Sequence, residues 1–268
     1  MKTIVITGST SGIGKALTQY FAKDNRVFAG YRNENYVSDL EKLGVTPFYI
    51  NMTDPESIKL AAAFIKSQTD KIDTLINVAG CVVAGAMESI SPERIREQFQ
   101  INTFSHLDFS QRLWDLLDGG RVINISSMAS FGVFPFIAPY CTSKRALDML
   151  FNSMMLETKH NIKVISVKPG VIATPLWEKS ISGNKESIEN SQGFEKEMNF
   201  MVKNARKNQI HGLDVSKVVD LIAEINEVDN PKASYTIGPD AKAASILSRL
   251  PQDWINFLIK KGAKFKIK

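Results

Sequence analysis

The sequence predicts a single α/β domain in which a mainly parallel sheet of about seven strands carries helices on both faces. Short apolar, β-branched runs alternate with segments of helical pattern, and a turn rich in Gly, Ser and Thr follows the first run. A length of 268 residues fits one such domain. Ligands of these sheets bind beyond the carboxyl ends of the strands, where the informative residues of this chain lie.

The first half of the chain supplies four expected strands and the helices that follow them. Strands are expected at residues 3–7, 26–31, 45–50 and 73–77, and helices at 13–23 and 33–43, the second of which Gly44 ends. Thr53 or Asp54 caps the next helix, because Pro55 and Glu56 occupy its first turn.

The second half continues the alternation. Ser91, Pro92 and Glu93 open a long helix that is expected to reach residue 117, and a second long helix covers 140–159. Strands are expected at 121–126, at 162–167 and, as a short last strand, at 235–237. The polar, loosely patterned residues 175–213 are interpreted as a lid or substrate loop inserted in a domain that spans residues 1–250.

The basic charge is concentrated in the expected amphipathic tail, residues 251–268. The net charge is +5, and Trp254–Lys268 holds five lysines (Lys260, Lys261, Lys264, Lys266, Lys268) and no acid. A nucleic-acid-binding protein would more often show a stripe of basic residues along its fold, so no nucleic-acid partner is expected. Two interpretations of the tail remain open: a solvated segment, or a weak contact with an anionic membrane through Trp254, Phe257, Leu258 and Ile259.

Several other classes of protein are not favoured. Cys81 and Cys141 form no C-x-x-C motif, and His106, His160 and His211 lack metal-ligand spacing, so no metal site is expected. There is no signal-peptide pattern and no run of 18 apolar residues. We therefore expect a cytoplasmic protein.

The turn at residues 7–14 has the composition of a phosphate-binding loop. Its glycines let the backbone approach a phosphate, and the helix that follows offers free N–H groups. A P-loop is excluded because Ser9 and Ala16 stand where that motif requires Gly and Ser or Thr. The glycine spacing also differs from G-x-G-x-x-G.

Five ordered motifs resemble those of the short-chain dehydrogenase/reductase family. Thr7–Gly14 is similar to its T-G-x-x-x-G-I-G turn, Asn77–Gly80 to its N-N-A-G, and Ile125–Ser127 to its serine strand end. Tyr140–Lys144 is similar to its Y-x-x-S-K, and Pro169–Thr174 to its P-G-x-x-x-T. The resemblance covers about residues 3–240 and implies a Rossmann fold.

The resemblance also implies the site residues. The catalytic set is Asn102, Ser127, Tyr140 and Lys144, with Ser126 as the neighbouring alternative to Ser127 and with a water held by Asn102 linking Lys144 to solvent. The cofactor-binding set is Gly8, Ser9, Ser11, Gly12, Ile13, Gly14, Tyr31, Arg32, Asn51, Met52, Asn77, Ala79, Gly80, Tyr140, Lys144, Pro169, Gly170, Ile172 and Thr174. In this scheme Thr174 holds the nicotinamide carboxamide, and the side-chain oxygen of Asn51 accepts a hydrogen bond from the adenine amine.

Tyr140 and Lys144 stand four residues apart, so they share one face of a helix. A tyrosine hydroxyl has a pKa near 10. We expect an ammonium about 4 Å away to lower the pKa of Tyr140 by about three units, because that charge contributes roughly 4 kcal/mol at an effective dielectric of ~20. The pair is then a proton donor or acceptor near neutral pH.

The end of the second strand indicates the cofactor. An NAD enzyme places an acid there for the ribose 2′-hydroxyl, whereas this chain has Tyr31 followed by Arg32. A guanidinium can bind a 2′-phosphate with two hydrogen bonds, so NADP(H) is expected over NAD(H). The alternative for Arg32 is a surface salt bridge, and the nearest acid is Glu34.

We therefore expect an oxidoreductase that interconverts a carbonyl and an alcohol by hydride transfer with NADP(H). The alternatives are a non-catalytic dinucleotide-binding regulator and a membrane-surface protein acting through the tail. Family members pair through two long helices, here about residues 91–117 and 140–159, so a homodimer or homotetramer is expected. Phe131, Phe134, Phe136, Leu176 and Trp177 indicate an apolar pocket for a lipophilic substrate, although core packing explains these residues equally well.

Overall fold

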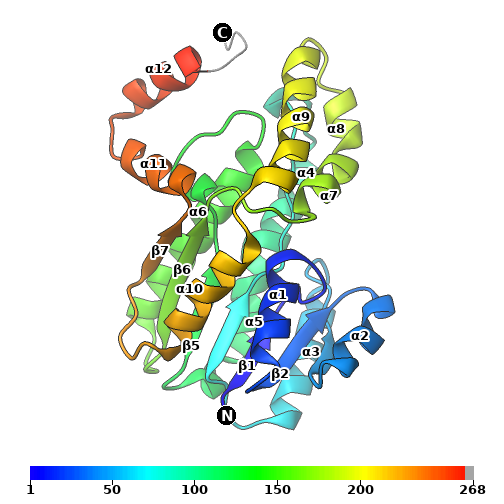
Figure 1. Cartoon of the computed structure of the whole chain (residues 1–268), viewed down its shortest axis with the longest axis vertical. Coiled ribbons are helices and arrows are strands. Elements are labelled where there is room, and N and C mark those ends of the chain that lie inside the picture. The colour runs from blue at the N-terminus through cyan, green and yellow to red at the C-terminus, as the bar shows by residue number, and fades with distance from the viewer. Residues whose placement is uncertain (263–268) are drawn as a thin grey trace.

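The computed structural model describes residues 1–262 and contains one seven-stranded sheet (Figure 1). The strand order is β3-β2-β1-β4-β5-β6-β7, and every neighbouring pair is parallel. The strands are β1 (Thr3–Ile6), β2 (Arg26–Tyr31), β3 (Thr46–Tyr49), β4 (Thr74–Asn77), β5 (Arg121–Ile125), β6 (Lys163–Pro169) and β7 (Ser234–Ile237). The predicted single α/β domain with a parallel sheet is confirmed.

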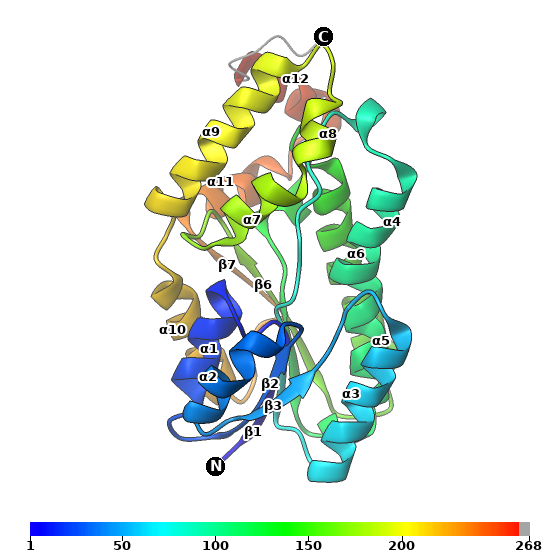
Figure 2. The same cartoon turned by 90° about the vertical axis from the view of Figure 1, so that its right-hand side faces the viewer.

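Helices cover both faces of the sheet (Figure 2). They are α1 (Gly12–Phe21), α2 (Val37–Lys42), α3 (Pro55–Gln68), α4 (Pro92–Phe99), α5 (Ser105–Arg112), α6 (Ala138–Glu157), α7 (Leu176–Gly183), α8 (Lys185–Glu189), α9 (Glu195–His211), α10 (Val215–Glu227), α11 (Pro239–Leu247) and α12 (Gln252–Gly262). Short 3-10 turns lie at Glu34–Tyr36, Met87–Ser89, Trp114–Leu117 and Met128–Phe131.

Two hydrophobic cores lie on opposite faces of the sheet, because successive side chains of a strand point to opposite sides. Val5 of β1 packs into the core that contains Phe109 of α5 and Phe151 of α6. Its neighbours Ile4 and Ile6 pack into the other core, with residues of α1 and α10. The strands are therefore apolar on both faces, as buried parallel strands must be.

The order of the strands reverses at β1, which pairs with β2 on one side and with β4 on the other. The connections that follow β1 and β4 consequently leave the sheet in opposite directions and open a crevice at its carboxyl edge. The phosphate-type turn follows β1, so the topology places it at this crevice.

The expected long helix from residue 91 is confirmed as a continuous helix from Pro92 to Arg112, but it does not continue regularly to residue 117. It is divided into α4, a π-helical segment at Gln100–Phe104, α5 and a 3-10 turn at Trp114–Leu117. A π-helical turn widens the helix by one residue and is frequent at functional sites. The predicted Asn102 lies in this segment and is fully buried.

Residues 175–213 contain more regular structure than expected, because α7, α8 and α9 occupy most of them. In the 17-residue α9 only Met198 is buried, so the apolar periodicity that would have indicated a helix is weak. Helices α10 and α11 were not predicted either. For α10 the signal was present: Asp214 caps it, and Val218, Val219, Ile222 and Ile225 share its buried face.

The tail begins with helix α12, and Lys264, Lys266 and Lys268 lie outside the described residues. In Figures 1 and 2, α12 lies at the same end of the molecule as α8 and α9. Among residues 1–262 no helix is both long and apolar enough to span a bilayer.

Candidate active site

A cleft of about 1130 Å³ lies at the carboxyl edge of the sheet, between the strand ends and helices α7 and α9. Most of the predicted site residues line it. They are Gly8, Ser11, Gly12, Ile13, Tyr31, Arg32, Asn51, Met52, Ala79, Gly80, Ser127, Tyr140, Lys144, Pro169, Gly170, Ile172 and Thr174. Segments far apart in the sequence therefore meet in one cavity.

The turn after β1 has the shape of a phosphate cradle. Gly8 and Gly12 have φ angles of 69° and 52°, which side-chain-bearing residues rarely adopt. A Cβ on Gly14 would lie 2.2 Å from the carbonyl oxygen of Gly8, so only glycine lets the turn close against α1. The turn thus presents the amino end of α1, with its free N–H groups, to the cleft, which is an arrangement that can bind an anion.

Four predicted residues lie behind the wall of the cleft and do not line it: Ser9, Gly14, Asn77 and Asn102. The hydroxyl of Ser9 donates to the carbonyl of Ile6 at 2.9 Å, inside the turn. The amide of Asn77 donates to Asn124 Oδ1 at 2.8 Å and joins β4 to β5. These residues build the frame of the site, and cofactor binding by Ser9, Gly14 and Asn77 and a catalytic role for Asn102 stay predictions.

Asn102 links three parts of the site. Its Oδ1 accepts from the backbone N–H of Cys81 at 3.0 Å, and its Nδ2 donates to the carbonyl of Cys81 and to Ser143 Oγ at 3.0 and 3.1 Å. Protein partners thus hold the side-chain amide, and the water expected at Asn102 stays a prediction. A Cβ on Gly80 would lie 3.3 Å from Asn102 Oδ1 and 3.7 Å from Lys144 Nζ, so this glycine lets both groups approach.

Tyr140 and Ser127 are in contact. The phenol is half-buried in the wall of the cleft and forms a hydrogen bond with the Ser127 side chain. Burial raises the pKa of Tyr140 to about 12, and the hydrogen bond from Ser127 opposes the rise. The neighbouring Ser126 is buried and its hydroxyl has no hydrogen-bond partner among the described residues, so Ser127 is the serine that faces Tyr140.

The charge of Lys144 is not among the groups that shift the pKa of Tyr140. Its ammonium donates to the carbonyl oxygen of Ile125 at 2.7 Å, at the end of β5. Burial lowers the pKa of Lys144 to about 8, and the carboxylate of Asp148 opposes this change. The predicted lowering of the Tyr140 pKa by three units is therefore wrong, because desolvation of the phenol dominates.

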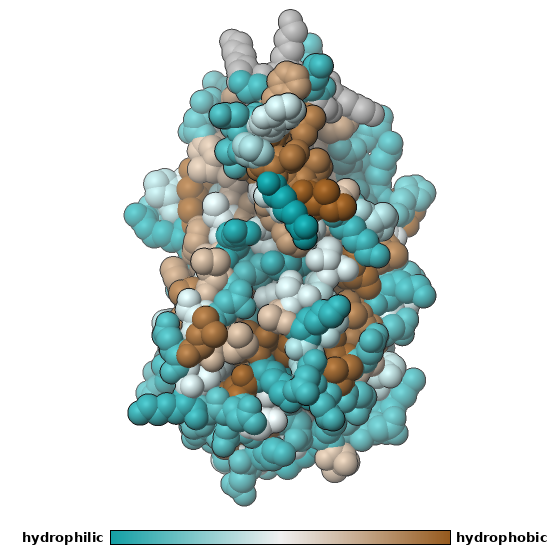
Figure 3. Space-filling model, turned by 90° about the vertical axis from the view of Figure 1, so that its left-hand side faces the viewer, coloured by the Kyte–Doolittle hydropathy of each residue, from teal (hydrophilic) through white to brown (hydrophobic). Residues whose placement is uncertain are grey.

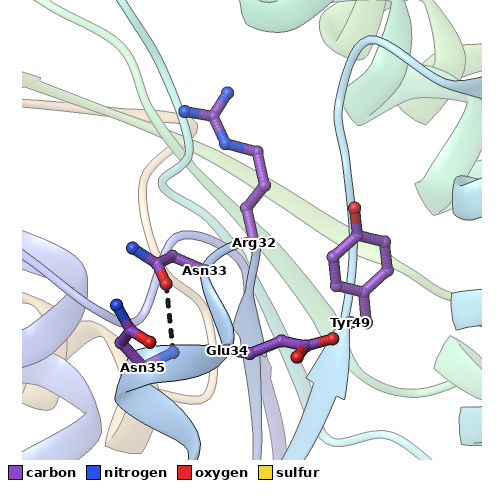
Figure 4. Close-up of a pocket in the computed structure, with 5 residues that line it drawn as sticks. All are labelled: Arg32, Asn33, Glu34, Asn35 and Tyr49. Atoms are coloured by element: carbon purple, nitrogen blue, oxygen red, sulfur yellow. Dashed lines mark hydrogen bonds between the residues drawn. The ribbon is translucent and has the colours of Figure 1, made fainter.

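Arg32 and Tyr31 stand at the end of β2 beside a second, open cavity of about 660 Å³ (Figure 4). The guanidinium extends away from Glu34, whose side chain points toward Tyr49. Arg32 is exposed and makes no ion pair within residues 1–262, so the salt-bridge alternative finds no partner there. The free cation lies where the cleft meets this cavity.

Asn51 lines the cleft but has hydrogen-bond partners of its own, and Phe131 lies outside the cleft. Asn51 Oδ1 accepts hydrogen bonds from the backbone and the hydroxyl of Thr53, at 3.1 and 2.9 Å, so the oxygen expected to accept the adenine amine is already bonded. The ring of Phe131 lies under Lys168 Nζ at 4.7 Å and does not line the cleft.

The apolar wall of the cleft was predicted only in part. Phe134, Phe136, Leu176 and Trp177 line it as expected. The wall also contains Met198, Phe200 and Met201 of α9, which the sequence analysis did not single out because that segment has no clear pattern. Lys179 of α7 was missed as well, since a lone lysine on an exposed helix gives no sequence signal.

The profile of the short chain dehydrogenase family matches residues 2–185. The chain belongs to the short-chain dehydrogenase/reductase family. Its relatives include the NADPH-dependent 3-dehydrocapnine reductase of Ornithobacterium rhinotracheale, which is 29% identical over 254 residues, 89% of each chain. A probable short-chain type dehydrogenase/reductase of Helicobacter pylori, VdlC, is 28% identical over 267 residues, 96% of each chain.

The fold is shared with solved structures of the same family. A short-chain dehydrogenase from Streptomyces avermitilis superposes with a TM-score of 0.78 at 22% identity, over 98% of each chain. As a short-chain dehydrogenase/reductase, the protein is an oxidoreductase that interconverts a carbonyl and an alcohol with a nicotinamide dinucleotide. Ser127, Tyr140 and Lys144 all line the cleft, and the alternative of a non-catalytic regulator is not favoured.

His106 of α5 lies behind the wall of the cleft at Ala79 and gives a testable pH dependence. It is fully buried, and its Nε2 donates to the carbonyl of Ala79 at 2.7 Å. Burial lowers the pKa of His106 to about 3, and the charge of Lys144 adds to this. Between that pKa and about 6.5, its value in an unfolded chain, only the unfolded state binds the proton, so native stability decreases as the pH falls through this window.

The variant His106→Gln keeps an N–H donor but does not titrate. Urea unfolding at several pH values between 3.5 and 6.5 should show a pH slope smaller by up to one proton, about 1.4 kcal/mol per pH unit. His160→Gln is the matched control, because His160 is exposed. Equal slopes for wild type and His106→Gln would contradict the burial of a neutral imidazole.

Proposed function

We propose that this short-chain dehydrogenase/reductase uses NADP(H) to reduce a lipophilic ketone or aldehyde, with Tyr140 as the proton donor. The observation that carries the proposal is the contact between the Tyr140 phenol and the Ser127 side chain in an apolar cleft whose outer end holds the free Arg32. Gly8–Gly14 would hold the pyrophosphate and Lys144 the nicotinamide ribose.

The bound dinucleotide supplies the hydride, and the residues of the chain handle the oxygen and its proton. Ser127 donates a hydrogen bond to the carbonyl oxygen and stabilises the negative charge that develops on it. Tyr140 then donates its hydroxyl proton to that oxygen. Because burial raises the Tyr140 pKa to about 12, the phenol is protonated at neutral pH, which is the form that reduction requires.

Besides holding the nicotinamide ribose, Lys144 has a second role in this proposal. Its ammonium, fixed on the Ile125 carbonyl, lies beside Gly80 at the floor of the cleft and can stabilise the phenolate that forms when Tyr140 loses its proton. Asn102 and Ser143 position this region, since Ser143 Oγ accepts from Asn102 and donates to the carbonyl of Tyr140 at 2.9 Å.

Four observations support the cofactor and the substrate class. Arg32 is free to bind a 2′-phosphate, and the relative from Ornithobacterium rhinotracheale is named as NADPH-dependent. The substrate end of the cleft is formed by aromatic, Leu and Met side chains. Phe136, which lines it, has a φ of 67°, a conformation that is costly for a bulky residue and that concentrates at binding sites.

The catalytic proposal is tested by NADPH oxidation with a panel of ketones and aldehydes that includes long-chain compounds. Tyr140→Phe should lower kcat by about 10²–10⁴-fold, because the proton donor is removed. NADPH binding, measured by fluorescence titration, should change little. Comparable kcat values for the variant and the wild type would exclude Tyr140 as the donor.

The cofactor proposal is tested at Arg32. Arg32→Ala should raise the Kd for NADPH by about 10- to 100-fold, because a charge-assisted contact with the 2′-phosphate is lost, and should leave the Kd for NADH nearly unchanged. Arg96→Ala is the control, since Arg96 pairs with Glu93 at 2.9 Å and does not line the cleft. An equal loss of NADH affinity would assign Arg32 a structural role.

We also propose that α12 rests on an anionic membrane. Trp254, Phe257 and Leu258 share one face of α12 and are exposed. Lys260 and Lys261 follow them, and the sequence adds Lys264, Lys266 and Lys268 with no acid. Figure 3 shows hydrophobic side chains gathered near this end of the molecule. Aromatic and leucine side chains beside lysines fit the boundary of a negatively charged bilayer.

Vesicle sedimentation at low salt tests the membrane contact. The full chain should sediment with vesicles that contain phosphatidylglycerol and much less with neutral phosphatidylcholine vesicles. The double variant Trp254→Ser, Phe257→Ser should stay in the supernatant, whereas Tyr20→Ser, on the exposed side of α1, should behave like wild type. If the wild-type protein does not sediment with phosphatidylglycerol vesicles, the proposed membrane contact is excluded.

Two further expectations stay predictions. A homodimer or homotetramer is supported by exposed apolar side chains on the expected pairing helices, namely Phe104 beside α5 and Met149, Leu150 and Leu156 on α6. A cytoplasmic location has no further support in the structure.

A further inference from the structure

A contact across the cleft joins the lid segment to the phosphate turn. The ammonium of Lys179, on α7, donates to the hydroxyl oxygen of Ser11 at 3.1 Å. The two residues are 168 positions apart in the sequence, and both line the cleft. One side of the contact is the substrate lid, and the other is the turn proposed to hold phosphate.

Lys179 has no acidic partner within residues 1–262. Its neighbour Glu178 is directed to α9, where its carboxylate lies 3.8 Å from Arg206 Nε and its backbone N–H donates to Gln209. The lysine charge is therefore not neutralised by the lid, and it is aimed at the turn.

The Ser11 side of the contact is also available to an anion. Ser11 precedes α1 as its N-cap residue, yet its side chain makes no capping hydrogen bond to the helix. No acidic residue lies in the first turn of α1, so the positive end of the helix dipole is not neutralised by the helix itself. The Lys179 ammonium and the amino end of α1 thus converge at Ser11. Because both are positive, an anion bound between them would stabilise this arrangement.

The base of α7 is fixed next to the same turn. Trp177 Nε1 donates to the carbonyl of Ile172 at 2.8 Å, and a Cβ on Gly12 would lie 3.4 Å from Thr174. Lys179 follows Trp177 by two residues and reaches over the turn from this anchored end. The neighbouring Glu178 joins α7 to α9, so α7 and α9 carry Lys179 together.

We propose that Lys179 binds the pyrophosphate of the cofactor and thereby holds the lid, residues 175–213, closed over the cleft. This contact is called the latch below. The Lys179 ammonium pairs with the pyrophosphate of the dinucleotide at the Gly8–Gly14 turn and holds α7 and α9 over the substrate end of the cleft. Cofactor binding thereby completes the apolar wall that Met198, Phe200 and Met201 provide. The inference rests on the proposed function, because it requires a dinucleotide on this turn.

The latch is tested by binding, without turnover. In Lys179→Met the side chain keeps its length and loses its charge, and the Kd for NADPH should rise about tenfold, as expected for loss of one charge-assisted contact. Adenosine 2′-monophosphate lacks the pyrophosphate, so its Kd should be the same for wild type and Lys179→Met. Lys179→Arg should restore NADPH affinity. Lys185→Met is the matched control on the neighbouring helix α8, where Lys185 is exposed.

A second measurement reports the lid itself. Limited trypsin digestion should cleave wild-type protein within residues 175–213 more slowly when NADPH is present, and adenosine 2′-monophosphate should give no such protection. In Lys179→Met, saturating NADPH should protect this segment less than it does in Lys185→Met. Lysines within the segment provide the cleavage sites, and Lys203 and Lys207 remain in both variants.

The outcomes separate the latch from the proposed function. Wild-type protein that binds neither NADPH nor NADH would overturn the proposed function and the latch together. Wild-type binding with an unchanged NADPH Kd in Lys179→Met would overturn only the latch. A Kd for adenosine 2′-monophosphate that rises as much as the Kd for NADPH would also overturn it, since the effect would then not require a pyrophosphate.

Discussion

The carboxyl edge of the parallel sheet is the constraint on which the site depends. Because all seven strands run in one direction, β1, β2, β4, β5 and β6 end at the same edge. The phosphate turn, Arg32, Gly80, Ser127 and Thr174 follow these ends in that order. Residues as far apart in the sequence as Gly8 and Thr174 therefore line one cleft, although no local sequence pattern links them.

Burial then sets the chemistry of the groups at this edge. Tyr140 and Lys144 are both shielded from water by the protein. Because desolvation disfavours the charged form of each group, it raises the pKa of the phenol and lowers the pKa of the ammonium. Lys144 is held in place by the Ile125 carbonyl, and Asp148 is a buried carboxylate on the same helix, 3.0 Å from Lys168. These partners make a buried lysine tolerable and keep a phenol that can donate its proton.

Many motif residues serve the frame of the site and not its surface. Asn77 joins two strands, Ser9 closes the turn on Ile6, and Asn102 ties Cys81 to Ser143 through a π-helical segment. Their motif positions were predictable, but the direction of each side chain was not. A resemblance transfers a residue type and a position, whereas the partners of a side chain depend on what the rest of the fold brings near it.

The sequence by itself determined the α/β class, the Gly8–Gly14 turn, the Tyr140–Lys144 pair and the position of Arg32, because these depend on local periodicity and short motifs. Only the tertiary structure decided that Ser127 and not Ser126 faces Tyr140, that Lys144 binds Ile125, and that Lys179 reaches Ser11. Helix α9 belongs to this second group, since its polar sequence gives little periodic signal and its apolar residues acquire a role only against the cleft. Local pattern fixes elements, but the contacts between them arise from packing.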